Sequence, residues 1–217
     1  MNLFKKEQED VKVIRPPCYG WLEKRLSDEE MNYLWKCVDS RKEESHKHRL
    51  AGQIHESNLL IDKNNWFFNK TIKPLFSKYV AEFDNLGSGA PVNQRHPYYL
   101  QQMWVNYQKE GEFNPPHDHN GVYSFVVWMK IPTKHFEQNK NPLSLKSNTH
   151  VISAFQFQYT NILGQIRPYT YEMNPEMEGT MLFFPAKLTH EVFPFFNCDK
   201  DRISISGNIS LNTTKLL

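Results

Sequence analysis

Short stretches with strand character follow one another along the second half of the chain, and this succession constrains the fold more than any other feature. Each stretch is rich in aromatic and β-branched residues, and Gly, Pro or Asn residues separate it from the next. Such closely spaced strands favour an antiparallel sandwich or small barrel over βαβ units. The predicted strands cover residues 99–108, 121–131, 152–160, 165–173, 179–185, 189–196 and 202–211.

The first half of the chain has helical patterns instead. Ser27 and Glu30 have the spacing of a capping box, and the apolar stripe that follows predicts a helix over about residues 28–43. A second apolar stripe predicts a helix from about residue 65 to 85, which Pro74 should kink or restart. Helices first and strands second is an α+β order, mainly β here, in which the helices pack on the outer face of one sheet.

Length and composition suit one globular domain with a sizeable core, because 39% of the 217 residues are hydrophobic and 23% are charged. We expect a single domain over residues 1–217. Residues 1–97 would form an extended segment and the flanking helices, and residues 98–211 the strand core. The formal net charge of +2 is too balanced to indicate a nucleic-acid partner.

Neither cysteines nor apolar runs suggest a secreted or membrane-bound protein. The three cysteines are odd in number and form no CxxC pair, so a disulfide framework or zinc knuckle is not expected. No apolar stretch approaches the roughly 20 residues that cross a bilayer. The charged first 13 residues lack the apolar region of a signal peptide. We therefore expect a cytoplasmic protein without a membrane partner.

A cluster of metal-competent residues precedes the predicted strand 121–131. Asp118 lies between His117 and His119, and side chains alternate along a strand, so the two histidines can point the same way while Asp118 points opposite. Two imidazoles on one face can bind a single metal ion. His190, beside a later strand, is the candidate third ligand.

Three arrangements of this site are open. His117, His119 and His190 could form an all-histidine site. If the segment is a turn, Asp118 could ligate in place of His119. Alternatively, only two protein side chains bind the metal, or none does. The sequence departs from the common site with two histidines and one carboxylate, because the residue two positions after His117 is His119 and not Asp or Glu.

The last predicted strand has a polar and an apolar face. Arg202 and Ser204 share one face, and isoleucines occupy the other, which we expect to pack against the N-terminal helices. A guanidinium offers a planar fork that matches a carboxylate, and a serine hydroxyl two residues on can reach the same anion. This pair is therefore a candidate carboxylate-binding site.

Together these segments resemble the prolyl 4-hydroxylase-like 2-oxoglutarate/Fe(II) dioxygenases over about residues 98–211. The segment from Tyr107 to His119 is similar to their Tyr…Gly…His-x-Asp motif, and His190 with Arg202-Ile203-Ser204 is similar to their distal histidine and Arg-x-Ser motif. The resemblance implies a double-stranded β-helix, a jelly-roll of two sheets with flanking helices.

The resemblance also implies roles for individual residues. His117 and His190 match the two metal histidines, and His119 stands where the family has its acidic ligand. Arg202 would pair with the distal carboxylate of 2-oxoglutarate. The implied cosubstrate-binding residues are Tyr107, Arg202 and Ser204.

The implied activity is that of a dioxygenase that uses Fe(II), 2-oxoglutarate and O₂ to hydroxylate a C–H bond. Family analogy alone suggests a peptidyl, for instance prolyl, or amino-acid substrate. The alternatives are a cupin-like metal-binding protein or non-redox enzyme, or a catalytically degenerate interaction module. The polar stretch over residues 133–148 predicts a long surface loop, a candidate lid.

Overall fold

The computed structural model describes residues 12–14, 16–41, 45, 47, 51–90, 92 and 94–216. Its strands are β1 (Leu22–Arg25), β2 (Glu56–Leu59), β3 (Tyr98–Gln108), β4 (Asn114–His117), β5 (Tyr123–Lys130), β6 (Phe155–Thr160), β7 (Ile166–Tyr171), β8 (Thr180–Pro185), β9 (His190–Val192) and β10 (Arg202–Leu211). The α-helices are α1 (Asp28–Asp39), α2 (Lys73–Glu82) and α3 (His135–Gln138). The other helical segments are η2 (Lys63–Asn65), η3 (Phe68–Ile72), η4 (Leu86–Gly89) and η5 (Pro175–Met177).

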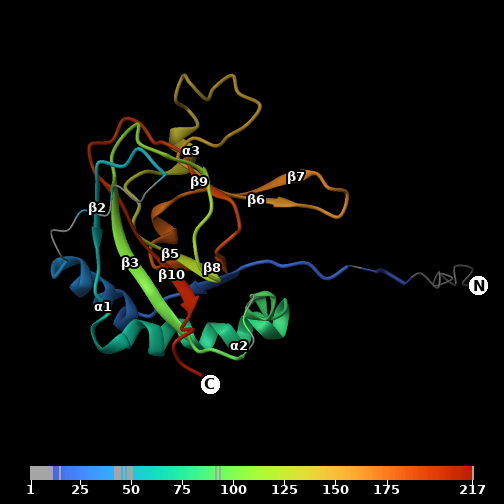
Figure 1. The fold of residues 1–217 in the computed structure, drawn as a ribbon. Helices are drawn as coiled ribbons and strands as arrows, with labels where there is room; N and C mark the ends of the chain where they lie inside the picture. Colours follow the sequence, from blue (N-terminus) through green and yellow to red (C-terminus); the bar gives the residue numbers. More distant parts are fainter. Residues whose placement is uncertain are drawn as a thin grey trace, which may run out of the picture.

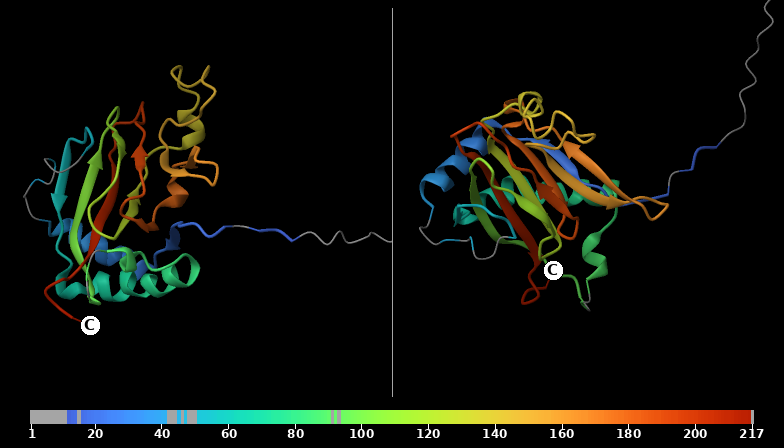
Figure 2. Two further views of the ribbon diagram at one scale, coloured as in Figure 1. Left: turned by 45° about the vertical axis from the view of Figure 1, so that its right-hand side comes forward. Right: turned by 90° about the horizontal axis from the view of Figure 1, so that it is seen from above.

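Two antiparallel sheets face one another, and α1 and α2 cover the outer side of the larger one (Figures 1 and 2). The strand order is β1-β8-β5-β10-β3-β2 in the six-stranded sheet and β4-β9-β6-β7 in the four-stranded sheet. The α+β, mainly β jelly-roll class expected from the sequence is confirmed.

The predicted capping box begins α1. The Ser27 hydroxyl accepts from the Glu30 N–H at 3.3 Å, and the Glu30 carboxylate accepts from the Ser27 N–H at 2.8 Å. The same buried carboxylate also accepts from Lys24 at 2.7 Å and from the Thr71 hydroxyl at 2.8 Å. Glu30 therefore ties β1, α1 and η3 together.

Pro74 restarts the second helix as expected. It lies in the first turn of α2, directly after η3, so the change of helix type occurs beside it. The preceding segment η3 is π-helical, and the Lys73 N–H bonds to the Phe68 carbonyl, five residues back. The Asp62 carboxylate accepts from the N–H groups of Phe67 and Phe68, each at 2.9 Å, and so begins this helical region.

Strand β5 lies at the centre of the fold and is buried on both faces, which explains its continuous apolar sequence. Tyr123, Phe125 and Val127 pack against the helices in the outer core. Val126 and Trp128 point the other way, into a second core between the two sheets. The predicted isoleucine face of β10 also lies in the outer core, as expected.

Three short strands, β1, β2 and β4, were not among the predicted elements. Strands β1 and β2 come from residues 1–97 and pair at the two edges of the six-stranded sheet, so the sheet draws on both halves of the chain. Residues 1–11 of the expected extended segment lie outside the described residues. The stretch 133–148 contains the short helix α3. Among the described residues, no helix has both the length and the apolar character needed to cross a bilayer.

Candidate metal centre

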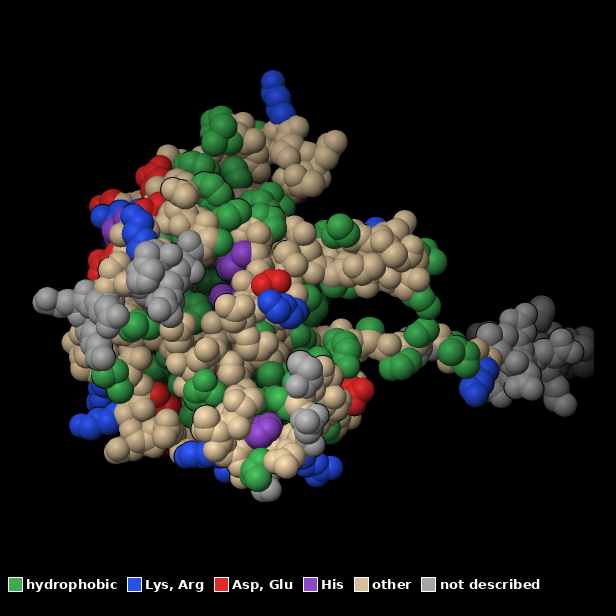
Figure 3. Space-filling view, in the orientation of Figure 1, with side chains coloured by type: hydrophobic (Ala, Val, Ile, Leu, Met, Phe, Trp, Pro, Cys, Tyr) green, Lys and Arg blue, Asp and Glu red, His purple; other side chains and the backbone are tan. Residues whose placement is uncertain are grey.

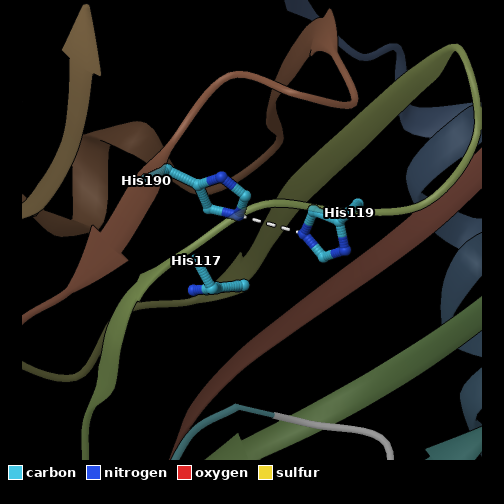
Figure 4. A group of neighbouring side chains, drawn as sticks. All are labelled: His117, His119 and His190. Atoms are coloured by element: carbon cyan, nitrogen blue, oxygen red, sulfur yellow. Dashed lines mark hydrogen bonds between the residues drawn. The ribbon is translucent and has the colours of Figure 1, made fainter.

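Three histidines from two neighbouring strands converge on one point (Figure 4). Strand β4 pairs with β9, and this register sets His117 opposite His190. His119 follows two residues after β4 ends. One ring nitrogen of each histidine lies within 4.8 Å of those of the other two. The structure thus brings together the three histidines singled out by the sequence.

The ring nitrogens are arranged as adjacent ligands of one ion would be. Nε2 of His119 lies 3.0 Å from Nε2 of His190. Two imidazole nitrogens that bind one ion at right angles, each at about 2.1 Å, are about 3.0 Å apart. Two rings are also fixed from behind, since Nδ1 lies 2.7 Å from the Pro115 carbonyl in His117 and 2.9 Å from the Leu188 carbonyl in His190. With Nδ1–H donating to a carbonyl, Nε2 keeps its lone pair for a metal.

Burial keeps these imidazoles neutral. The pKa of His119 is lowered to about 3, first by burial and then by the neighbouring His117. Burial likewise lowers the pKa of His117 and, more strongly, that of His190. Aromatic rings surround His190, with the Phe184 ring centroid 5.1 Å away. Neutral imidazoles can bind a metal without first releasing a proton.

Asp118 does not join the three histidines. Its carboxylate is half exposed and accepts from the Lys187 ammonium at 3.1 Å, at the rim of the site. Strand β4 ends at His117, and the His119 N–H then bonds to the Ala186 carbonyl at 2.8 Å. His117 and His119 thus point inward and Asp118 outward, the alternation expected from the sequence. The arrangement in which Asp118 replaces His119 is therefore disfavoured.

The histidines line a cavity of about 350 Å³ between the sheets, and histidine side chains (purple) are visible in a hollow on one face of the molecule (Figure 3). The opposite wall is the inner face of β5, β10 and β3, where side chains align in cross-strand rows. The rows are Trp128–Ser204–Asn106, Val126–Ser206–Trp104 and Ser124–Asn208–Gln102. Ser204 therefore faces the cavity, as predicted.

Arg202 lies next to the first of these rows but does not line the cavity. Its guanidinium is fully buried and donates from Nη2 to the Ser153 carbonyl at 2.9 Å and the Ser153 hydroxyl at 2.6 Å. Nη1 reaches Oε1 of Gln108 at 3.4 Å, and the Phe195 ring centroid is 5.0 Å away. Within the described part of the chain it has no carboxylate partner. Burial lowers its pKa to about 9, so it stays charged at neutral pH.

Tyr107 is placed differently from the expectation. It alternates with Asn106 and Gln108 on β3 and therefore faces away from the cavity. Its ring packs on the outer core with the Arg41 guanidinium carbon 5.4 Å from its centroid. The inward-facing neighbour Asn106 takes the place in the cavity that Tyr107 was expected to fill.

Asn106 and Trp128 contribute polar groups to the cavity that the sequence analysis did not predict. Both are buried, and neither Oδ1 of Asn106 nor Nε1 of Trp128 has a hydrogen-bond partner among the residues that the structure describes. They flank Ser204 in one cross-strand row. From the sequence, alternation along β10 shows which residues share a face with Ser204. The register that sets Asn106 and Trp128 beside Ser204 cannot be deduced from a single sequence.

Part of the sequence and most of the fold are similar to those of known proteins. A family model described as putative 2OG-Fe(II) oxygenase matches residues 102–208. An oxidoreductase of the 2OG-Fe(II) oxygenase family from Burkholderia pseudomallei has 12% identity and a TM-score of 0.52, over 86% of this chain and 81% of its own. A prolyl-4-hydroxylase from Pseudomonas putida has 13% identity and a TM-score of 0.51, over 89% of this chain and 94% of its own.

No protein of curated function has a significantly similar sequence. The resemblance expected from the motifs is nevertheless confirmed, by the family match over residues 102–208 and by a fold shared over most of the chain. The chain is thus similar to 2OG-Fe(II) oxygenases in the sequence of residues 102–208 and in its fold.

Proposed function

We propose that the protein is a 2-oxoglutarate- and Fe(II)-dependent dioxygenase that hydroxylates a substrate C–H bond, with His117, His119 and His190 holding the iron. The convergence of three neutral imidazoles in a cavity of an oxygenase fold carries this proposal. Imidazole ligands suit Fe(II), and three of them leave positions open for cosubstrate and O₂. His119 stands in for the usual carboxylate ligand.

Iron bound here would supply the O₂ activation that couples oxidation of 2-oxoglutarate to hydroxylation. In the balanced reaction, R–H, 2-oxoglutarate and O₂ give R–OH, succinate and CO₂, with one oxygen atom in succinate and the other in the alcohol. The chain's own contribution is to hold the three imidazoles and shield them. Phe155 and Phe184 line the cavity beside His190 and limit the access of water.

One part of the cavity wall provides donors for a carboxylate. Ser204 and the buried Nε1–H of Trp128, which has no hydrogen-bond partner among the described residues, lie in one row, and Arg202 starts the same strand as Ser204 two residues earlier. Nε of Arg202 is also buried and has no partner in the described part of the chain. A buried cation without a counter-charge is costly, and an anion bound beside it would offset that cost. These donors and the buried cation support the proposal that the distal carboxylate of 2-oxoglutarate binds at this end of the cavity.

Removing two of the imidazoles tests the metal assignment. The double variant His117→Ala/His190→Ala should contain almost no iron after anaerobic loading, whereas wild type should hold about one ion per chain, as a single mononuclear site requires. Elemental analysis after desalting measures this. His96→Ala is the matched control, because His96 is partly buried and lies outside the group. Unchanged iron content in the double variant would remove the central claim.

The proposed reaction does not by itself define the substrate. One protein of similar fold is a prolyl-4-hydroxylase, and by analogy a peptidyl or amino-acid substrate is our starting expectation. A cupin-like metal protein is the alternative, since three histidines also suit Zn²⁺ or Ni²⁺. Iron binding without 2-oxoglutarate binding would favour that alternative.

A further inference from the structure

Carboxamide side chains dominate the polar lining of the cavity. The six are Gln101, Gln102, Asn106, Asn114, Asn120 and Asn208. Among the described lining residues, Asp118 is the one that carries a formal charge, and Lys187 forms an ion pair with it. We propose, building on the dioxygenase function, that the substrate group admitted here is uncharged and rich in hydrogen-bonding atoms, namely a carboxamide or a sugar hydroxyl group.

Neighbouring serines orient two of these carboxamides. The Ser124 hydroxyl donates to Oδ1 of Asn208 at 2.9 Å, and the Ser210 hydroxyl donates to Oε1 of Gln101 at 2.8 Å. Because the carbonyl oxygens are held, the amide NH₂ groups stay available as donors. A carboxamide has two donors and one acceptor oxygen, so the set can match a group that both donates and accepts.

The cost of desolvation favours binding of a neutral substrate group over a charged one. A carboxylate or ammonium that enters the cavity loses hydration and needs an opposite charge in return. Asp118 and Lys187 already satisfy one another at the rim, and Arg202 lies behind the lining at the end assigned to the cosubstrate. A free amino acid would bring two such charges. An amide or hydroxyl exchanges its hydrogen bonds with water for equivalent ones with the carboxamides.

The cavity volume limits the substrate group to a small one. About 350 Å³ lies near the lower end of the range of ligand pockets, and the cosubstrate shares this space. A single amide side chain or one sugar ring fits this limit. Prolyl rings, by contrast, would leave the carboxamides without partners, and sites built for hydrogen bonding discriminate strongly against groups that lack it.

The test compares neutral and charged probes of nearly the same shape. The pairs are N-acetyl-asparagine methylamide with N-acetyl-aspartate methylamide, and glucose with glucuronate. Succinate release from 2-oxoglutarate by the iron-loaded protein is measured with each probe at equal concentration. We expect the neutral member of one pair to raise the rate about tenfold or more over its charged partner. Which pair responds distinguishes an amide from a sugar.

Two substitutions connect this preference to the cavity. Gln102→Lys places a cation in the lining and should shift the preference toward the anionic member, whereas Gln165→Lys, in an exposed turn, should leave it unchanged. The inference would be overturned if the charged members stimulated succinate release as strongly as the neutral ones or more strongly. It would also be overturned if no member of either pair stimulated it. Absence of succinate in every sample, together with no 2-oxoglutarate binding by the iron-loaded protein in anaerobic calorimetric titration, would instead contradict the dioxygenase function.

Discussion

At the scale of single residues, the buried histidines make the stability of the metal-free protein depend on pH. An unfolded histidine titrates near pH 6.5, whereas burial lowers the pKa of His119 to about 3 in the folded chain. Between these values the unfolded state binds the proton and the folded state does not, so the free energy of unfolding falls as pH falls. The slope is at most about 1.4 kcal/mol per pH unit for each such histidine.

Urea unfolding of the metal-free protein between about pH 6.5 and 5 measures this slope, above the range in which carboxylates such as Glu30 titrate. The variant His119→Gln should show a shallower dependence than wild type, because it removes one of the titrating groups. Equal slopes for the two proteins would show that His119 is not held neutral by the fold.

Ser204 allows a second test at this scale, on the cosubstrate end of the cavity. Loss of one hydrogen bond to a charged group costs about 1.5–3 kcal/mol, so Ser204→Ala should weaken 2-oxoglutarate binding by about tenfold or more. Anaerobic calorimetric titration of the iron-loaded protein measures the affinity. Ser77→Ala, at an exposed position on α2 away from the cavity, is the control. Wild-type affinity in Ser204→Ala would exclude this serine from the carboxylate site.

At the scale of elements, β10 must pack closely on both faces to hold the cavity wall against the outer core. A Cβ added at Gly207 would lie 2.5 Å from the Phe125 ring and 2.8 Å from the Gln102 carbonyl. Gly207→Ala should therefore destabilise the protein by about 1–3 kcal/mol, the usual effect of overpacking. At Gly89 an added Cβ meets nothing within 4 Å. Gly89→Ala should change stability by less than about 1 kcal/mol, and equal unfolding midpoints in urea for the two variants would contradict this packing.

Elements with local signals were predictable from the sequence, and those formed by tertiary pairing were not. The Ser27 capping box and Pro74 mark helix starts through contacts within a few residues, and the structure contains both. Strands β1, β2 and β4 are four residues each, too short for a periodic pattern to identify them. The orientation of Tyr107 was not predictable either, because the pairing of β3 with β10 decides which face of β3 lines the cavity.

At the scale of the whole molecule, the metal centre joins segments more than 70 residues apart in sequence, from His117 to His190. An ion that binds only the folded chain stabilises it, by about 2.7 kcal/mol when the free ion is at a hundred times its dissociation constant. Anaerobic Fe(II) should therefore raise the melting temperature of wild type and have no effect on His117→Ala/His190→Ala. An equal rise in both proteins would indicate binding elsewhere.

The position of four site residues was predictable from residue types and spacing, but the rest of the cavity lining was not. The structure places His117, His119, His190 and Ser204 around one cavity, because imidazoles and a strand hydroxyl have recognisable patterns. The carboxamide lining combines residues from β3, β4, β10 and the loop after His119. Only the assembled fold shows that these residues meet.

The most direct test of the central claim is an anaerobic Fe(II) titration with and without 2-oxoglutarate, followed by visible absorption. The account predicts a metal-to-ligand charge-transfer band that requires both additions. The band should be lost in His117→Ala/His190→Ala and weakened in Arg202→Ala. Tight iron binding without any band in wild type would contradict the dioxygenase assignment and favour a metal protein of cupin type.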